Sequence, residues 1–73
     1  MATISREQLR SVWSSWSQAK IAYDELYLQI LDAWDQLSPG EQLLCKQALF
    51  ESYERLNSAK EEYKKKAQEF FGY

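Results

Sequence analysis

Histidine is absent from the 73-residue chain, and cysteine, proline and glycine are scarce, with one, one and two copies. The lack of histidine removes the commonest general base and the commonest metal ligand. A single cysteine cannot form an internal disulfide, and no apolar run approaches the roughly 18 residues of a membrane span. We therefore expect no enzymatic activity, no metal, no cofactor, no small-molecule substrate and no membrane association.

The chain also has no large excess of positive or negative charge, because nine basic and eleven acidic side chains give a net charge of −2. Such a balance provides no general attraction to nucleic acid or to an anionic membrane. The opening residues, 1–5, show none of the features of a signal peptide. We expect a cytoplasmic protein, located in the host cytoplasm if it is phage-encoded.

The few helix-breaking residues divide the chain into two long segments. Pro39 and Gly40 stand together near the middle, and Gly72 is next to last. Nothing in the two segments between these positions forbids a helix, so a hairpin of two helices is the simplest interpretation. The prediction is a single helical-hairpin domain over residues 1–73, with a helix over about 5–36, a turn over about 37–40 and a helix over about 39–71.

Both helix starts carry a capping box, in which two side chains satisfy each other's backbone N–H groups. Ser5 with Gln8 forms the first, and Ser38 with Glu41 forms the second, where Pro39 suits the first helical position. These pairs predict where each helix begins.

Apolar and small residues recur at alternating spacings of three and four along both segments, which is typical of helices that pack along a seam. The seam residues of the first segment are Leu9, Val12, Trp16, Ala19, Tyr23, Leu26, Ile30, Ala33 and Leu37. Those of the second segment are Cys45, Leu49, Ser52, Leu56, Ala59, Tyr63, Lys66 and Phe70. The pattern predicts an all-α, coiled-coil-like antiparallel hairpin.

Further large apolar side chains lie beside this seam, so one seam leaves apolar surface uncovered. A chain this short has a small core, and we expect a second copy or a larger protein to complete a helical bundle. Aromatic residues often anchor such contacts. The predicted partner-binding residues are Trp13, Tyr27, Leu31, Trp34, Leu43, Phe50 and Tyr53. If the helices were rotated from this register, the same residues would instead form the intramolecular core.

Two features that resemble chemical sites have simpler explanations. Asp24, Glu25, Asp32 and Asp35 form an acidic region, but di-iron sites in bundles also need histidine, which is absent. Cys45 has no base beside it that would activate a thiol, and its place on the seam suits a small buried residue. We expect neither feature to be catalytic.

The functional prediction is a small non-enzymatic module for protein–protein interaction. It would act as an accessory subunit, an adaptor or an inhibitor of a larger protein, a profile that phage-encoded proteins often have. The alternative is a homodimeric four-helix bundle that acts as a small regulator and binds nucleic acid through Lys60, Lys64 and Lys65 of the second helix. We expect nucleic acid to be the less favoured partner.

The turn resembles that of the plasmid copy-number regulators of the Rop type, on the basis of Leu37, Glu41, Gln42 and Cys45. That resemblance implies a hairpin that dimerises into a four-helix bundle and binds paired RNA loops. The RNA-contacting residues of that family have no match on the first helix here, so the resemblance concerns architecture alone.

Overall fold

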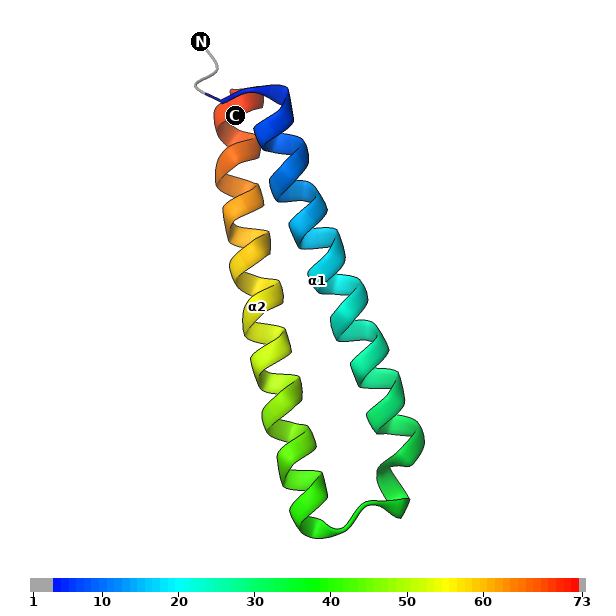
Figure 1. Ribbon diagram of the computed structural model, residues 1–73. Coiled ribbons are helices and arrows are strands. Elements are labelled where there is room, and N and C mark those ends of the chain that lie inside the picture. The colour runs from blue at the N-terminus through cyan, green and yellow to red at the C-terminus, as the bar shows by residue number, and fades with distance from the viewer. Residues whose placement is uncertain (1–3, 73) are drawn as a thin grey trace.

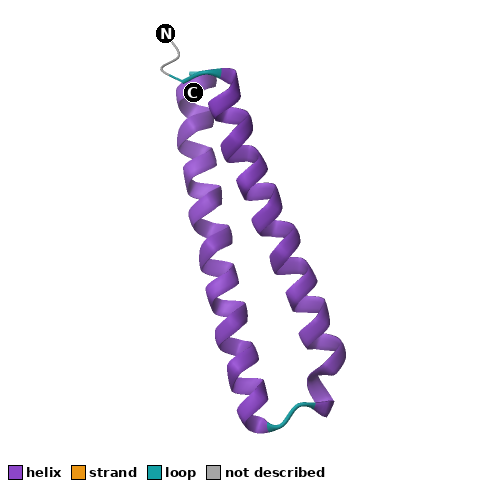
Figure 2. Ribbon diagram, viewed as in Figure 1, coloured by secondary structure: helices purple, strands orange, loops and turns teal. Residues whose placement is uncertain are grey.

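A computed structural model describes residues 4–72 as two long antiparallel helices joined by a tight turn (Figure 1). Helix α1 spans Arg6–Ala33, the short 3-10 helix η1 spans Trp34–Gln36, and α2 spans Pro39–Phe71. The described residues contain no strand (Figure 2), and the two helices pack against each other. The predicted all-α two-helix hairpin is therefore confirmed.

Both helices begin at the predicted caps. The Ser5 hydroxyl accepts from the Gln8 N–H at 3.1 Å, and the Gln8 side chain accepts from the Ser5 N–H at 2.9 Å. Ser38 and Glu41 form the same pair of bonds at 3.2 and 2.9 Å. At the other end of α2, Gly72 is left-handed, with φ of 80°, a conformation that glycine adopts without steric cost.

The end of the first helical segment differs from the prediction of one helix to about residue 36. Residues 34–36 tighten into η1, and the Leu37 N–H closes it by donating to the Trp34 carbonyl at 3.2 Å. The Gln42 side-chain amide of α2 donates to the same carbonyl at 3.1 Å. These bonds satisfy a carbonyl that the α-helix leaves free at its end. They also tie the turn to the second helix.

The hairpin is a thin rod with very little interior. It measures 55 × 15 × 14 Å, and its radius of gyration of 16.4 Å exceeds the roughly 11 Å expected of a compact chain of this length. Among residues 4–72 only Ile30, at 8% exposed, and Ala67, at 1%, are buried. Ala67 lies toward the end that carries the termini, where the two ribbons run closest together (Figure 1).

The predicted seam faces inward on both helices. Every one of its residues is buried or half-buried, whereas most other positions of α1 and α2 are exposed. Across the seam the rings of Trp16 and Tyr63 stack at 5.0 Å between centroids, and those of Tyr23 and Tyr53 approach to 5.9 Å. The rotated register, with the flanking aromatic residues inside, is not the one observed.

Two isoleucines of α1 provide a matched test of this arrangement. Ile30 is buried on the seam and Ile21 is 57% exposed. Ile30→Ala should lower the free energy of unfolding by about 2 kcal/mol or more, because it removes packed methyl groups. Ile21→Ala should change it by less than about 0.5 kcal/mol. Urea unfolding followed by circular dichroism measures both, and equal losses would contradict the register.

The second capping box makes stability depend on pH. The pKa of the Glu41 carboxyl is held below the usual 4.5 by hydrogen bonds with Ser38. The bond from the Ser38 backbone N–H has the larger effect, and the bond with the Ser38 side chain has the smaller one. A lowered pKa in the folded state contributes stability above the unfolded pKa, and this stability is lost as the pH falls from about 4.5 through the folded pKa.

Glu41→Gln keeps the capping geometry but removes this titration, since glutamine also serves in a capping box. The melting temperature of the wild type should therefore fall more steeply than that of the variant below about pH 4.5. Thermal melts at a series of pH values from neutral to acidic measure the difference. Parallel curves for the two proteins would show that the Glu41 carboxylate does not contribute.

Candidate functional site

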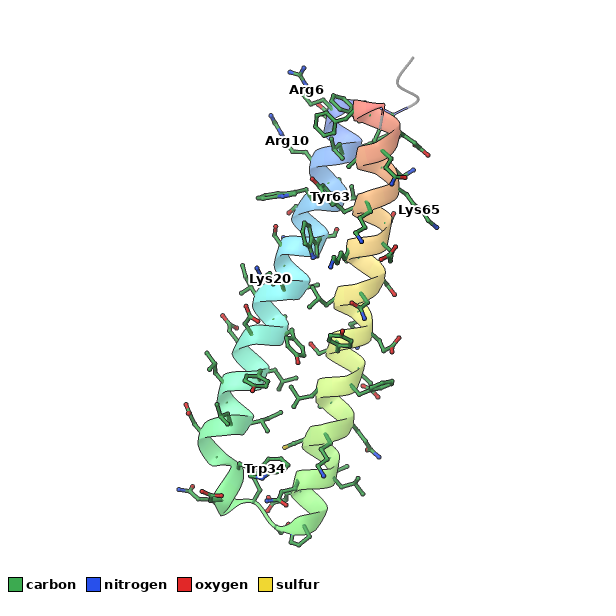
Figure 3. All side chains as sticks on the ribbon, turned by 180° about the vertical axis from the view of Figure 1, so that it is seen from behind. Arg6, Arg10, Lys20, Trp34, Tyr63 and Lys65 are labelled. Carbon is green, nitrogen blue, oxygen red and sulfur yellow. The ribbon has the colours of Figure 1, made fainter. Side chains whose placement is uncertain are left out.

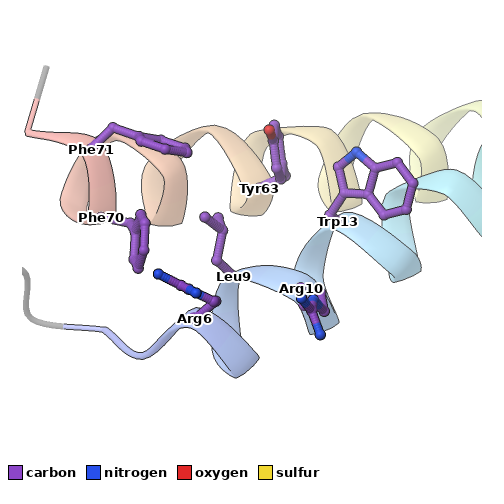
Figure 4. A pocket seen from close by; sticks show the side chains of 7 residues that line it. All are labelled: Arg6, Leu9, Arg10, Trp13, Tyr63, Phe70 and Phe71. Atoms are coloured by element: carbon purple, nitrogen blue, oxygen red, sulfur yellow. The ribbon is translucent and has the colours of Figure 1, made fainter.

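Three grooves follow one another along the hairpin, each lined by both helices. The terminal groove, of about 400 Å³, lies beside the chain ends (Figure 4). It is lined by Arg6, Leu9, Arg10, Trp13, Tyr63, Phe70 and Phe71. Figure 4 shows the first four of these residues rising from α1 and the other three from α2. Large apolar side chains therefore stay accessible between the helices at this end.

The other two grooves continue toward the turn. The middle groove, of about 350 Å³, is lined by Trp16, Lys20, Tyr23, Asp24, Tyr53, Leu56, Asn57 and Lys60. The turn groove, of about 220 Å³, is lined by Tyr27, Ile30, Leu31, Trp34, Lys46 and Leu49. Small-molecule sites typically enclose roughly 300–1,000 Å³ and bury most of their ligand. A succession of modest grooves along a rod is better suited to an elongated partner.

The helical repeat places all three grooves on one side of the hairpin. Along α1 and into η1 a residue next to the seam recurs every seven positions, and each such residue lines a groove: Arg6, Trp13, Lys20, Tyr27 and Trp34. The equivalent positions of α2 are Lys46, Tyr53 and Lys60. In an antiparallel pair these two rows lie on the same side. We call the surface made by the three sets of lining residues the grooved face.

Trp34 connects the turn to the grooved face. Its backbone carbonyl accepts the Gln42 bond, and its half-buried ring lies between the two helices just above the turn (Figure 3). The Lys46 ammonium lies 5.9 Å from the centre of that ring, within cation–π range. An aromatic ring and a cation from different helices thus meet at one end of the face.

Most of the predicted partner-binding residues lie on the grooved face. Trp13 lines the terminal groove and Tyr53 the middle groove. The turn groove takes Tyr27, Leu31 and Trp34. The structure thus brings five of the predicted residues to one side of the rod, where they are distributed over the three grooves.

The remaining two predicted partner-binding residues lie elsewhere. Leu43 is 57% exposed and Phe50 is 63% exposed, and neither lines any of the three grooves. They share the seven-residue column of α2 that includes Asn57 and Phe71, which do line grooves, so position on the helix alone does not decide which residues line one. They can extend the contact area at the rim of the grooved face, but they do not shape a groove.

The three lysines of the nucleic-acid alternative do not gather into one patch. Lys60 lines the middle groove, whereas the Lys64 ammonium lies 3.8 Å from the Glu61 carboxylate. Lys65 projects from the outer side of α2, away from α1 (Figure 3). Only Lys60 among the three therefore contributes to the grooved face.

Charge distinguishes the grooved face from the rest of the molecule, and sequence reasoning missed it. Five of the nine basic residues line the grooves, but only one of the eleven acidic residues, Asp24, does so. Outside the grooves the chain has four basic and ten acidic side chains. The signal was present in the seven-residue spacing that joins Arg6 and Lys20 to the flanking aromatic residues.

The features considered for catalysis remain isolated. Cys45 is a half-buried free thiol on the seam. Within residues 4–72 no three side chains among cysteine, aspartate and glutamate are grouped so that they could hold a metal ion. Neither α1 nor α2 is both long enough and apolar enough to cross a membrane. The grooved face is therefore the candidate functional site.

No protein-family model, curated protein or solved structure matches this chain. The fold and the site define a helical hairpin with one aromatic and basic face.

Two tryptophans one helical turn apart report on this geometry. Trp13 is 52% exposed in the terminal groove, whereas Trp16 is half-buried and stacked on Tyr63. In variants that keep one of these tryptophans and replace the other two with phenylalanine, acrylamide should quench Trp13 several-fold more effectively than Trp16. Equal quenching in dilute solution would mean that something already covers the grooved face.

Proposed function

We propose that the chain is a non-enzymatic module for protein–protein interaction that docks through its grooved face. The module would act as an accessory subunit, an adaptor or an inhibitor of a larger protein. The single observation that carries this proposal is the row of three grooves on one side of the rod, in which aromatic side chains remain half-exposed beside a nearly absent core.

The size of the uncovered surface supports the proposal. The chain exposes 5853 Å², whereas a compact monomer of 8.7 kDa exposes about 4,700 Å². The excess of roughly 1,100 Å² is comparable with the ~800 Å² that each partner buries in a standard interface. The rod therefore has surface to spare for an interface of ordinary size.

The kinds of residue on the face also support docking. Tryptophan, tyrosine and arginine are the residues that most often dominate binding energy at protein interfaces. Trp13 and Tyr27 are about half exposed, with apolar ring surface available for contact. Arg6 and Arg10 border the terminal groove and can donate hydrogen bonds at its rim.

Two leucine substitutions test the location of the docking site. Leu31 is 56% exposed in the turn groove, whereas Leu44 is 65% exposed and lines none of the three grooves. Leu31→Glu should weaken partner binding by at least about tenfold, or about 1.4 kcal/mol, because it places a charge in the apolar contact. Leu44→Glu should bind as the wild type does.

The measurement has two stages. Affinity capture from the native source, read by mass spectrometry, identifies proteins retained by the wild type and by Leu44→Glu but lost with Leu31→Glu. Calorimetric titration of the purified partner then gives the two dissociation constants, with circular dichroism checking that each variant keeps its helices. Equal loss of binding in both variants would remove the grooved face as the docking site.

A further inference from the structure

We infer, building on the proposed function, that the occupant of the grooved face is an amphipathic helix with acidic flanks. It lies lengthwise in the three grooves and completes a three-helix bundle. Its apolar stripe contacts the aromatic side chains, and its carboxylates meet the basic residues that border the grooves.

The shape of the face suits a helix. The groove-lining residues of α1 recur every seven positions from Arg6 to Trp34, which spans about 42 Å at ~1.5 Å per residue. A helix whose apolar residues repeat every seven positions keeps one stripe against such a row. Peptide helices that bind in apolar grooves use this kind of stripe.

The charge of the face selects an acidic partner. Five basic residues and one acidic residue line the grooves of a chain whose net charge is −2. The basic residues are Arg6, Arg10, Lys20, Lys46 and Lys60. Charges that flank an apolar helical seam set the choice of partner by attraction and repulsion. The acidic flanks of a partner helix would contact these cations. They would also lie away from the other surfaces of the hairpin, where most of its acidic residues are.

The middle groove carries this argument most directly. Lys20 from α1 and Lys60 from α2 line the same groove, so two like charges occupy one stretch of the face. Although Asp24 also lines it, neither lysine has an ion pair within residues 4–72. A partner carboxylate at this level would compensate both charges, which the hairpin alone leaves unpaired.

A second copy fits this face poorly. A twofold dimer would place the face against itself, with an excess of positive charge on both sides. Contact between the face of one copy and the acidic outer surface of another would be head-to-tail, and such contacts do not close into a dimer. The charge pattern therefore favours a different chain.

Nucleic acid fits the spacing poorly. The five cations are spread along a face about 42 Å long, and Arg6 and Lys20, for example, are 14 residues apart on α1, or about 21 Å. Phosphates recur every few ångströms along a nucleic-acid strand, so most of them would have no cation opposite. The mostly acidic side chains outside the grooves would also repel them. Acidic residues two heptads apart on a partner helix have the same spacing as Arg6 and Lys20.

Two synthetic peptides test the inference against the full chain. Each has four heptads, the length of α1, with leucine along one stripe; the flanking positions are glutamate in one peptide and lysine in the other. We expect the glutamate peptide to bind at least about tenfold more tightly at low ionic strength, with the preference shrinking as salt screens the charges. Fluorescence anisotropy measures both affinities.

A charge-reversed variant with a matched control locates the effect. The double substitution Lys20→Glu with Lys60→Glu should abolish or reverse the preference. The double substitution Arg55→Glu with Lys65→Glu changes the net charge equally but alters exposed residues outside the three grooves, so it should keep the preference. If both double variants lose the preference equally, overall charge is responsible and the inference is wrong.

Other outcomes separate this inference from the proposed function. If both peptides bind equally well and Leu31→Glu weakens both, the face docks helices without selecting acidic ones, and only the inference fails. If neither peptide binds but a labelled oligothymidylate does, the occupant is nucleic acid. If sedimentation shows a dimer that Leu31→Glu dissociates, the occupant is a second copy. Either of these last two results overturns the inference.

Discussion

Two helices that pack as a pair share only one seam, which limits how much apolar surface the pair can bury. The other features of the molecule depend on this limit. Each helix turns only a narrow stripe toward its neighbour, so the seam side chains are mostly half-buried, and within residues 4–72 only Ile30 and Ala67 are buried. A third helix would enclose the same stripe from another direction, as in helical bundles. The rod shape, the exposed aromatic rings and the grooved face all follow from the pairing of just two long helices within residues 4–72.

The fold was predictable from the sequence because its signals are local. The capping residues Ser5 and Ser38, together with Pro39, fix where the helices begin, and the repeat of the seam residues fixes which sides meet. The change to a 3-10 turn at Trp34 was not predictable, because it depends on a bond from Gln42 across the turn. That bond joins residues on opposite sides of the turn, so the helical pattern of either segment alone does not indicate it.

The candidate site was predicted in part, for a similar reason. The spacing of Trp13, Tyr27 and Trp34 from the seam places them beside it, so their common side could be deduced. Phe50 was predicted from its place beside the seam, although it is 63% exposed and lines none of the three grooves. The basic residues that line the grooves were not predicted, because the nearly balanced total charge conceals their concentration on one face. Charge has to be read along the same seven-residue repeat as hydrophobicity.

The central claim is that the seam alone stabilises this chain only marginally and that a partner must supply the rest. The free energy of unfolding of the isolated monomer, from urea unfolding at low micromolar concentration, tests it most directly. The account predicts no more than about 3–5 kcal/mol, the range that a single small core provides. A much larger value that does not change with protein concentration would contradict it, because the hairpin would then need no further covering.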